Sequence, residues 1–302
     1  MELSIIIVSY NVRDLLRACI HSIFVQLGKI PLEVIVVDNC SSDESATMVE
    51  KEFPSVKIIR NHFNAGFSEA NNQGINIATG DYLLLLNPDT LLLDDSICRL
   101  ISFVREKNNT VLAAPKLLNA DRSLQYSAWH DKKLSVLLQE TFRIFTSAYA
   151  LEKYAIPYEV ENVAGAAMLF SKSLLERTGN LDTDFFWMED FDFCYRVRKC
   201  GGAVFYFPDA VVIHHGGKSV IQDPGIMYAN DNIGKLKFYK KHKSAFQSII
   251  AGLLILFHLF AYTFFLLLLS PFSKKYREKL FPYFHATVKF LKYIFGKKVP
   301  IT

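Results

Sequence analysis

Apolar residues in the first third of the chain occur in short unbroken runs, which alternate with stretches where they recur every third or fourth position. A short unbroken run is typical of a strand buried on both faces, and the second spacing is typical of an amphipathic helix. This pattern predicts strands at Ser4–Val8, Leu32–Asp38, Val56–Arg60 and Tyr82–Leu86, and helices at Val12–Leu27, Asp43–Phe53 and near Ser68–Ala78. We therefore predict an α/β fold with a mostly parallel sheet and helices on both faces.

Carboxylates follow two of these strands. The stretch "LLLLNPDT" ends the fourth strand and continues into Asn87, Pro88 and Asp89, while Asp38 closes the second strand. Pro88 cannot continue a hydrogen-bonded ladder. Ligands of parallel sheets bind at the carboxyl ends of the strands, so the two acids predict a shared polar site. Taken singly, each acid has a simpler explanation as a cap of the next helix.

A second apolar region lies near the end of the chain. Ile249–Leu269 contains no formally charged residue and would form a helix of ~30 Å, the thickness of a bilayer's hydrocarbon core. We consider three arrangements: a single membrane span, a segment lying in the membrane with Leu280–Phe295 as an interfacial helix carrying Lys289 and Lys292, or a buried core helix.

Charge divides the chain at about the same place. Residues 235–302 contain 13 Lys or Arg and one acid, which gives a net charge of +12. Residues 1–234 contain 21 Lys or Arg and 29 Asp or Glu, which gives a net charge of −8. We predict a soluble domain at 1–234 and a membrane-associated tail at 235–302. A basic tail on an acidic body fits an anionic membrane surface, and it argues against a nucleic-acid partner.

The five cysteines are scattered without CxxC spacing, which indicates neither a zinc site nor a disulfide framework and favours a reducing cytosol. The N-terminal run "SIIIV" is too short for the core of a signal peptide, so export is not expected.

Six stretches together resemble the inverting nucleotide-sugar glycosyltransferases of family 2, especially their rhamnosyltransferase-like branch. They occur in the family's order over residues 4–220: "SIIIVSYN", "VIVVDNCSSD", "NAGFSEANNQG", "LLLLNPDT", "MEDFDFCYRVRKCGG" and "HHGGKS". The resemblance implies that residues 1–234 form a catalytic domain with a GT-A fold, which is Rossmann-like.

The resemblance also implies a donor site. Tyr10 would stack on the nucleobase and Asp38 would accept a hydrogen bond from it. The other residues that we assign to donor binding are Asn11, Asn64, Gly66, Asn72 and Asn87.

A metal site is implied beside the donor. Asp89 resembles the metal-binding acid of the family's DxD element, in which Asn87 here replaces the first acid, and His214 resembles a histidine that reaches the same metal. One carboxylate, one imidazole and a diphosphate suit Mg²⁺ or Mn²⁺. By its sequence context alone, His214 could equally be a structural residue.

By the same resemblance, Asp190 is the general base, and Glu189 supports it or binds the acceptor together with Trp187. Burial among the aromatic rings of "FFWMEDFDF" is expected to raise the pKa of a carboxyl group toward the working range of a base. Asp192 is expected to pair with Arg196 one helical turn later.

Glycines in "HHGGKS" predict a flexible lid at Gly216–Gly217 near the diphosphate. Lys218 and Ser219 would donate hydrogen bonds to its phosphate groups. Neither this stretch nor "NAGFSEANNQG" has the spacing of a dinucleotide-binding or P-loop motif. The chain also lacks the QxxRW motif of processive synthases, which favours transfer of one sugar at a time.

The sequence thus predicts an inverting, metal-dependent transferase at the cytoplasmic face of the cell membrane. The branch indicates dTDP-rhamnose as donor and a polyprenyl-diphosphate-linked or other glycan as acceptor. Two alternatives stay open: a catalytically silent nucleotide-sugar-binding scaffold and a nucleotidyltransferase.

Overall fold

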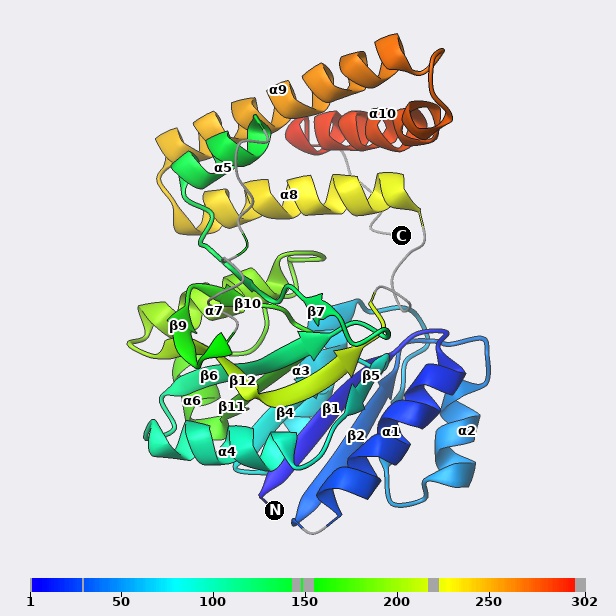
Figure 1. The fold of residues 1–302 in the computed structure, drawn as a ribbon, viewed down its shortest axis with the longest axis vertical. Coiled ribbons are helices and arrows are strands. Elements are labelled where there is room, and N and C mark those ends of the chain that lie inside the picture. The colour runs from blue at the N-terminus through cyan, green and yellow to red at the C-terminus, as the bar shows by residue number, and fades with distance from the viewer. Residues whose placement is uncertain (1, 29, 143–147, 149–154, 217–222, 297–302) are drawn as a thin grey trace. The chain divides into compact units, whose positions relative to one another are not determined.

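The computed structural model describes residues 2–28, 30–142, 148, 155–216 and 223–296, and the chain forms two units (Figure 1). Unit 1 comprises Met1–His130, Ala148–Asp184 and Glu189–Ser219, and unit 2 comprises Asp131–Ser147, Phe185–Met188 and Val220–Thr302. The boundary predicted after residue 234 falls inside a helix of unit 2, which begins at Pro224.

The main sheet of unit 1 has the strand order β3-β2-β1-β4-β11-β6-β12-β5. Its strands are β1 (Leu3–Ser9), β2 (Leu32–Asp38), β3 (Lys57–Arg60), β4 (Tyr82–Leu86), β5 (Thr90–Leu92), β6 (Val111–Leu118), β11 (Ala167–Ser171) and β12 (Ala203–His214). The first four strands of this order are parallel, and β12 is parallel to β6. Strand β11 runs antiparallel to β4 and β6, and β5 runs antiparallel to β12. The predicted α/β fold with a mostly parallel sheet is confirmed.

The described part of unit 1 also contains four shorter strands: β7 (Leu124–Gln125), β8 (Ala128–Trp129), β9 (Tyr158–Val160) and β10 (Asn162–Val163). Strand β7 pairs with β6 and β9 pairs with β12, while β8 and β10 form a separate two-stranded sheet.

Helices cover both faces of the main sheet. The helices that pack on one face are α1 (Arg13–Leu27), α2 (Ser45–Glu52) and α4 (Ser96–Glu106). The helices that pack on the other face are α3 (Phe67–Ile77), α6 (Lys172–Thr178) and α7 (Glu189–Lys199). This two-sided burial explains the unbroken apolar runs in the sequence.

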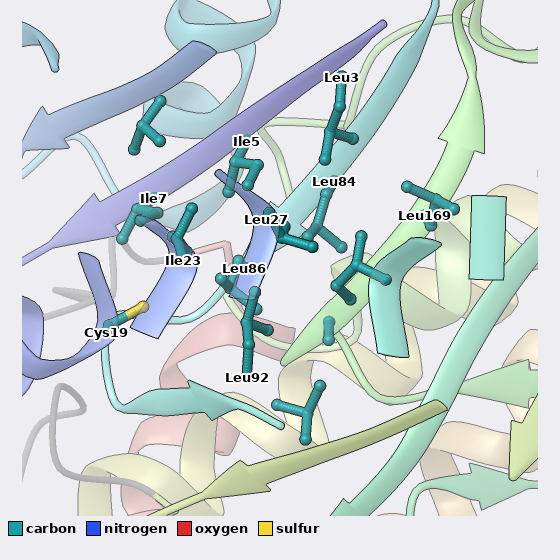
Figure 2. Packing of buried hydrophobic residues seen from close by; sticks show 14 of the residues in the cluster. Leu3, Ile5, Ile7, Cys19, Ile23, Leu27, Leu84, Leu86, Leu92 and Leu169 are labelled. Carbon is teal, nitrogen blue, oxygen red and sulfur yellow. The ribbon is translucent and has the colours of Figure 1, made fainter. Parts of the chain in front are cut away.

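The leucine run that precedes Asn87 is divided between the two faces. Leu84 and Leu86 point into the cluster beneath α1 and α4 (Figure 2), whereas Leu83 and Leu85 pack in the opposite cluster. Successive strand residues point to opposite faces, so four leucines in a row fit only a strand with two apolar sides.

Unit 2 is helical in the part of the chain that the structure describes. Its helices are α5 (Leu134–Thr141), α8 (Pro224–His242), α9 (Ala245–Leu269) and α10 (Lys274–Ile294). A shared apolar core includes Leu236 of α8, Ile255 of α9 and Phe290 of α10. Among the described residues, α9 is the one helix long and apolar enough to cross a membrane, judged by length and composition alone. Because 17% of its apolar window is buried, it is not the buried core helix that was one of the three predicted arrangements.

Candidate active site

Asp38 lies at the carboxyl end of β2, opposite Ser9 of β1, and is 4% exposed. Its Oδ2 accepts a hydrogen bond from the Ser41 backbone N–H at 3.0 Å. Its Oδ1 is buried and has no hydrogen-bond partner among the described residues. A buried carboxylate oxygen without a partner is costly, so this atom is suited to accept a donor from a ligand. Asp43, rather than Asp38, bonds the backbone of Ser45 at the start of α2.

Tyr10 and Asn11 form the loop after β1. Tyr10 is half-buried, and Asn11 has a left-handed backbone with φ of 54°. The Asn11 Oδ1 accepts from the Ser42 N–H at 2.7 Å, and the Asn11 N–H donates to the Ser41 Oγ at 3.0 Å. Asn11 therefore binds the loop after β1 to the loop after β2.

Asn39 joins the loops after β2 and β3. It was not among the site residues predicted from sequence. Its Nδ2 donates to Asn64 Oδ1 at 3.1 Å and to the Gly66 carbonyl at 3.2 Å. Its Oδ1 accepts from Asn61 Nδ2 at 2.8 Å and from the Ala65 N–H at 3.2 Å. Gly66 has φ of 83°, a conformation that favours glycine. The predicted donor residues Asn64 and Gly66 are thus held in place by a side chain adjacent to Asp38.

Asn72 lies on α3, and its side chain is occupied. Its Nδ2 donates to the Leu181 carbonyl at 2.8 Å and its Oδ1 accepts from the Leu181 N–H at 3.0 Å. Gly74 on the same helix brings α3 close to β1, because a Cβ there would lie 2.5 Å from the Ile6 side chain. These contacts fix the helix that follows the Asn64–Gly66 loop.

Asp89 and His214 meet because β5 pairs with β12. After Leu86 the chain turns, β5 begins at Thr90, and Thr90 lies opposite His214 in the ladder. Asp89 is 1% exposed, and its Oδ1 lies 3.3 Å from His214 Nε2. Asp89 precedes a strand, so the alternative of a helix-capping acid is wrong.

Gln125 fixes the orientation of the His214 ring. The Gln125 Nε2 donates to Asn119 Oδ1 at 2.8 Å, which leaves Gln125 Oε1 as the acceptor facing His214 Nδ1 at 2.7 Å. With the proton on Nδ1, the lone pair of a neutral imidazole is on Nε2, beside Asp89 and 3.3 Å from Asn87 Nδ2. This is the arrangement in which a histidine can ligate a metal, with Gln125 as the partner of its other nitrogen.

The side chains that could ligate a metal here fit a hard divalent cation that also binds a diphosphate ligand. One carboxylate, one imidazole and the amide of Asn87 lie together, and the described residues contain no group of three or more His, Cys, Asp or Glu that could hold a metal alone. A cation here would need oxygens from a diphosphate to complete its coordination.

Asp190 lies in the first turn of α7, where the helix dipole favours negative charge. Its Oδ2 accepts from the Gly165 N–H at 3.1 Å and its Oδ1 accepts from the Phe191 N–H at 2.8 Å. Glu189, the preceding residue, is half-buried. Trp187, predicted to bind the acceptor, is half-buried and belongs to unit 2.

The predicted pair on the same helix is confirmed: Arg196 Nε donates to Asp192 Oδ2 at 2.8 Å, and Asp192 is fully buried.

Residues 165 and 166 connect Asp190 to the other groups. Gly165 donates to Asp190, and the carbonyl of Ala166 accepts from the Asn87 N–H at 2.9 Å. On the other side, the Phe67 ring lies 3.8 Å from the position of a Cβ on Gly165, and Phe67 directly follows Gly66. A continuous series of contacts therefore links the loops after β2, β3 and β4 with the start of α7.

Part of the predicted lid is described by the structure. Gly216 has φ of 69° and lies beside the Gln125 side chain. Gly217, Lys218 and Ser219 lie outside the described residues.

Comparison with solved structures shows the fold. The mannosyltransferase PcManGT from Pyrobaculum calidifontis, solved with GDP-Man and Mn²⁺, matches with a TM-score of 0.62 at 18% identity, over 98% of this chain and 88% of that chain. GalNAc-T7, solved with UDP, GalNAc and Mn²⁺, matches with a TM-score of 0.55 at 19% identity, over 70% of this chain and 43% of that chain. The fold is GT-A, as the sequence resemblance implied.

Curated relatives are identical to this chain at about a quarter of the aligned positions. The N-acetylglucosaminyl-diphospho-decaprenol L-rhamnosyltransferase of Mycobacterium tuberculosis is 26% identical over 64% of this chain and 70% of its own length. The low-salt glycan biosynthesis hexosyltransferase Agl10 of Haloferax volcanii is 27% identical over 66% of this chain and 62% of its own length. A poly(ribitol-phosphate) beta-glucosyltransferase of Bacillus spizizenii is 26% identical over 67% of this chain and 33% of its own length. The match thus spans from a third to about seven tenths of these relatives.

A model of one family matches residues 4–179, which is more than half of the chain and includes the strands and loops that carry Asp38, Asn64 and Asp89. The chain belongs to glycosyl transferase family 2.

Proposed function

We propose that the protein transfers a single sugar from a nucleoside diphosphate sugar to a hydroxyl group, by one displacement that inverts the anomeric carbon. The observation that carries this proposal is the series of contacts that links the loops bearing the unpartnered acceptor of Asp38, the adjacent Asp89 and His214, and the carboxylate of Asp190. These are the three kinds of group that such a displacement needs.

In this proposal the donor lies along the carboxyl edge of the sheet. The buried Oδ1 of Asp38 accepts an N–H of the nucleobase, whose face packs on Tyr10. Asn11, Asn64 and Gly66 shape the loops that border the base and ribose. Asn72 is left out of the proposed donor site, because Leu181 occupies its amide.

Asp89 and His214 would hold Mg²⁺ or Mn²⁺, with Asn87 beside them. When bound, the cation would stabilise the negative charge that develops on the departing diphosphate. Gln125 keeps the lone pair of His214 directed at Asp89. Both experimentally solved neighbours named above contain Mn²⁺, which agrees with a divalent cation.

Asp190 would remove the proton from the attacking hydroxyl. Backbone N–H groups of Gly165 and Phe191 hold its two oxygens in a fixed orientation, so the base is positioned before the acceptor arrives. Glu189 would bind the acceptor beside it. General-base assistance of this kind contributes ~10²–10⁴-fold to the rate.

We propose dTDP-rhamnose as the donor and a polyprenyl-diphosphate-linked glycan as the acceptor, in the synthesis of a cell-surface polysaccharide at the cytoplasmic face of the membrane. The mycobacterial relative, by its name, is a rhamnosyltransferase acting on a decaprenol-linked sugar. The apolar helix α9 and the basic tail of this chain agree with an acceptor that is bound to a membrane.

Stabilisation by donors tests the proposal directly. The thermal midpoint of the full chain should rise most with dTDP-rhamnose among dTDP-, UDP- and GDP-sugars, and only in the presence of Mn²⁺ or Mg²⁺. With the lipid-linked acceptor, nucleoside diphosphate should be released and proton NMR of the product should show inverted anomeric configuration. Release of pyrophosphate from a nucleoside triphosphate would instead identify a nucleotidyltransferase, and donor binding without turnover would identify a silent scaffold.

A further inference from the structure

Helix α9 of unit 2 has two different faces. Its buried residues recur mostly at three- or four-residue spacing: Ser248, Ala251, Ile255, Leu259 and Leu266. The large apolar residues of α9 that are each more than half exposed follow mostly the same spacing: Phe246, Ile249, Leu253, Phe257, Phe260, Phe264, Leu267 and Leu268. Of these, Phe257 also contacts Phe142, which directly follows α5, with ring centroids 5.9 Å apart. Because a helix repeats every 3.6 residues, the two sets lie on opposite sides of α9. An apolar stripe along a whole helix indicates a surface that an apolar phase or partner covers.

Helix α9 packs on three helices of unit 2, which are α5, α8 and α10. The rings of Tyr262 and Tyr283 are 4.5 Å apart, and those of Phe265 and Tyr276 are 5.9 Å apart, so α9 and α10 are antiparallel. On α8, the Leu236 side chain lies 3.6 Å from the position of a Cβ on Gly252. Helix α8 also contacts α10 directly.

Of these three helices, α8 and α10 are too charged to enter hydrocarbon. The charged residues of α10 are Lys274, Lys275, Arg277, Glu278, Lys279, Lys289 and Lys292, and those of α8 are Asp231, Lys235, Lys237, Lys240 and Lys241. Had α9 crossed a bilayer along its length, the helices packed on it would have entered with it. Charges at that depth are costly, so the packing of unit 2 disfavours a span.

We propose that α9 lies in the plane of the membrane, with its exposed stripe in the acyl region and α8 and α10 on the aqueous side. This inference rests on the proposed membrane location. It develops the arrangement in which α9 lies in the membrane, with α10 on the aqueous side instead of forming the interfacial helix that the sequence predicted. The occupant of the apolar face is an anionic lipid surface, because basic residues flank α9 on both sides. Lys240, Lys241 and Lys243 precede the helix, and four cations follow it within residues 274–279.

The same charges argue for one-sided insertion. A helix that spans normally has its basic flank on the cytoplasmic side, and α9 has a basic flank at each end. When the helix lies in the plane, both flanks contact headgroups of one leaflet. Each lysine near an anionic surface strengthens binding about fivefold, and salt weakens this contribution.

Topology is tested with a thiol placed after α9 by Lys275→Cys in the full chain, in sealed membrane vesicles. Cys40 of unit 1 is exposed and serves as the internal reference. A membrane-impermeant maleimide, read out by peptide mass spectrometry, should label both thiols in the same vesicle preparation. Labelling of Cys40 alone, with the introduced thiol reacting only after detergent is added, would show that α9 spans and would overturn the proposal.

Binding is tested with Leu253→Glu/Phe264→Glu, two residues of the exposed stripe that are each 62% exposed, and with Val25→Glu, 61% exposed on α1 of unit 1, as matched control. The double variant should bind vesicles of phosphatidylglycerol and phosphatidylcholine at least about tenfold more weakly, and the control should bind like the parent. Parental binding should also weaken on pure phosphatidylcholine.

Equal vesicle binding by the double variant and the control would overturn the proposal. So would conversion of a dimer to a monomer by the double variant without loss of vesicle binding, because the stripe would then join two copies. Donor-induced thermal stabilisation should be unchanged in every variant. If no nucleotide sugar stabilises even the parent, the proposed transferase function fails, and vesicle binding still tests this inference.

Discussion

Glu33 lies near the amino end of β2, at the end of the strand opposite Asp38, and joins three segments of unit 1. Its Oε1 accepts hydrogen bonds from Ser4 Oγ at 2.6 Å and from the N–H and Oγ1 of Thr79 at 2.6 and 2.7 Å. Its Oε2 accepts from Lys57 Nζ at 2.6 Å. Replacement by glutamine keeps the shape of the side chain and removes the charge on which these bonds depend.

The magnitude follows from the pKa of Glu33. Burial by itself raises this pKa, but the hydrogen bonds from Lys57, Ser4 and Thr79 outweigh burial and lower it from 4.5 to about 2. A lowering of this size corresponds to about 3 kcal/mol of folding free energy near pH 7. Because the pKa is lower in the folded state, this stabilisation is complete above the unfolded value and is lost as the pH falls from about 4.5 toward about 2.

Urea unfolding of the full chain, followed by far-ultraviolet circular dichroism, measures the effect. Glu33→Gln should lower the free energy of unfolding by about 3 kcal/mol near pH 7, and the gap to the parent should shrink to about 2 kcal/mol near pH 3.5. Glu50→Gln is the matched control, because Glu50 is 46% exposed in its pair with Arg60 and such pairs contribute about 0–1 kcal/mol. Equal unfolding free energies for the two variants, or a gap that does not shrink with acid, would refute the reasoning.

Three further outcomes are expected. A maleimide should modify the exposed Cys40 in the folded chain and leave Cys19 unmodified, because burial raises the pKa of that thiol to about 12; modification at similar rates would contradict the packing beneath β4. Gln125→Leu should weaken Mn²⁺ binding about 10–100-fold in thermal titrations with donor present, because His214 loses the partner of its Nδ1, and unchanged affinity would argue against a ligand role. Asp192→Ala should lower the free energy of unfolding by about 3 kcal/mol in urea, because it leaves a largely buried guanidinium without its carboxylate; a loss below about 1 kcal/mol would show that the pair is dispensable.

The first four strands could be predicted from sequence to within one residue at each end. The prediction of Ser4–Val8 compares with Leu3–Ser9 in the structure, and that of Tyr82–Leu86 is identical. These strands are buried on both faces, so local apolar runs are sufficient to identify them. Strand β11 is also a fully buried apolar run, but its antiparallel place between β4 and β6, like that of the short β5 beside β12, depends on partners distant in sequence.

The candidate site shows the same division. Asp38 and Asp89 were found because each follows a strand, and the sheet places the ends of parallel strands together. Gln125 was missed because its two-residue strand is positioned only by pairing with β6. Asn72 was assigned to the donor-binding site because it lies in the motif "NAGFSEANNQG". Its contact with Leu181, 109 residues away, could not be predicted from the sequence.

The measurement that tests the central claim most directly is the turnover of Asp190→Asn with its donor affinity measured in parallel. The introduced amide would retain an acceptor for the Gly165 N–H, so donor-induced thermal stabilisation should equal that of the parent. The rate of sugar transfer should fall ~10²–10⁴-fold, whereas Asp14→Asn, at an acid 76% exposed on α1, should leave it unchanged. Transfer at the parental rate by Asp190→Asn would contradict the assignment of Asp190 as the base and the convergence of groups on which the proposed function depends.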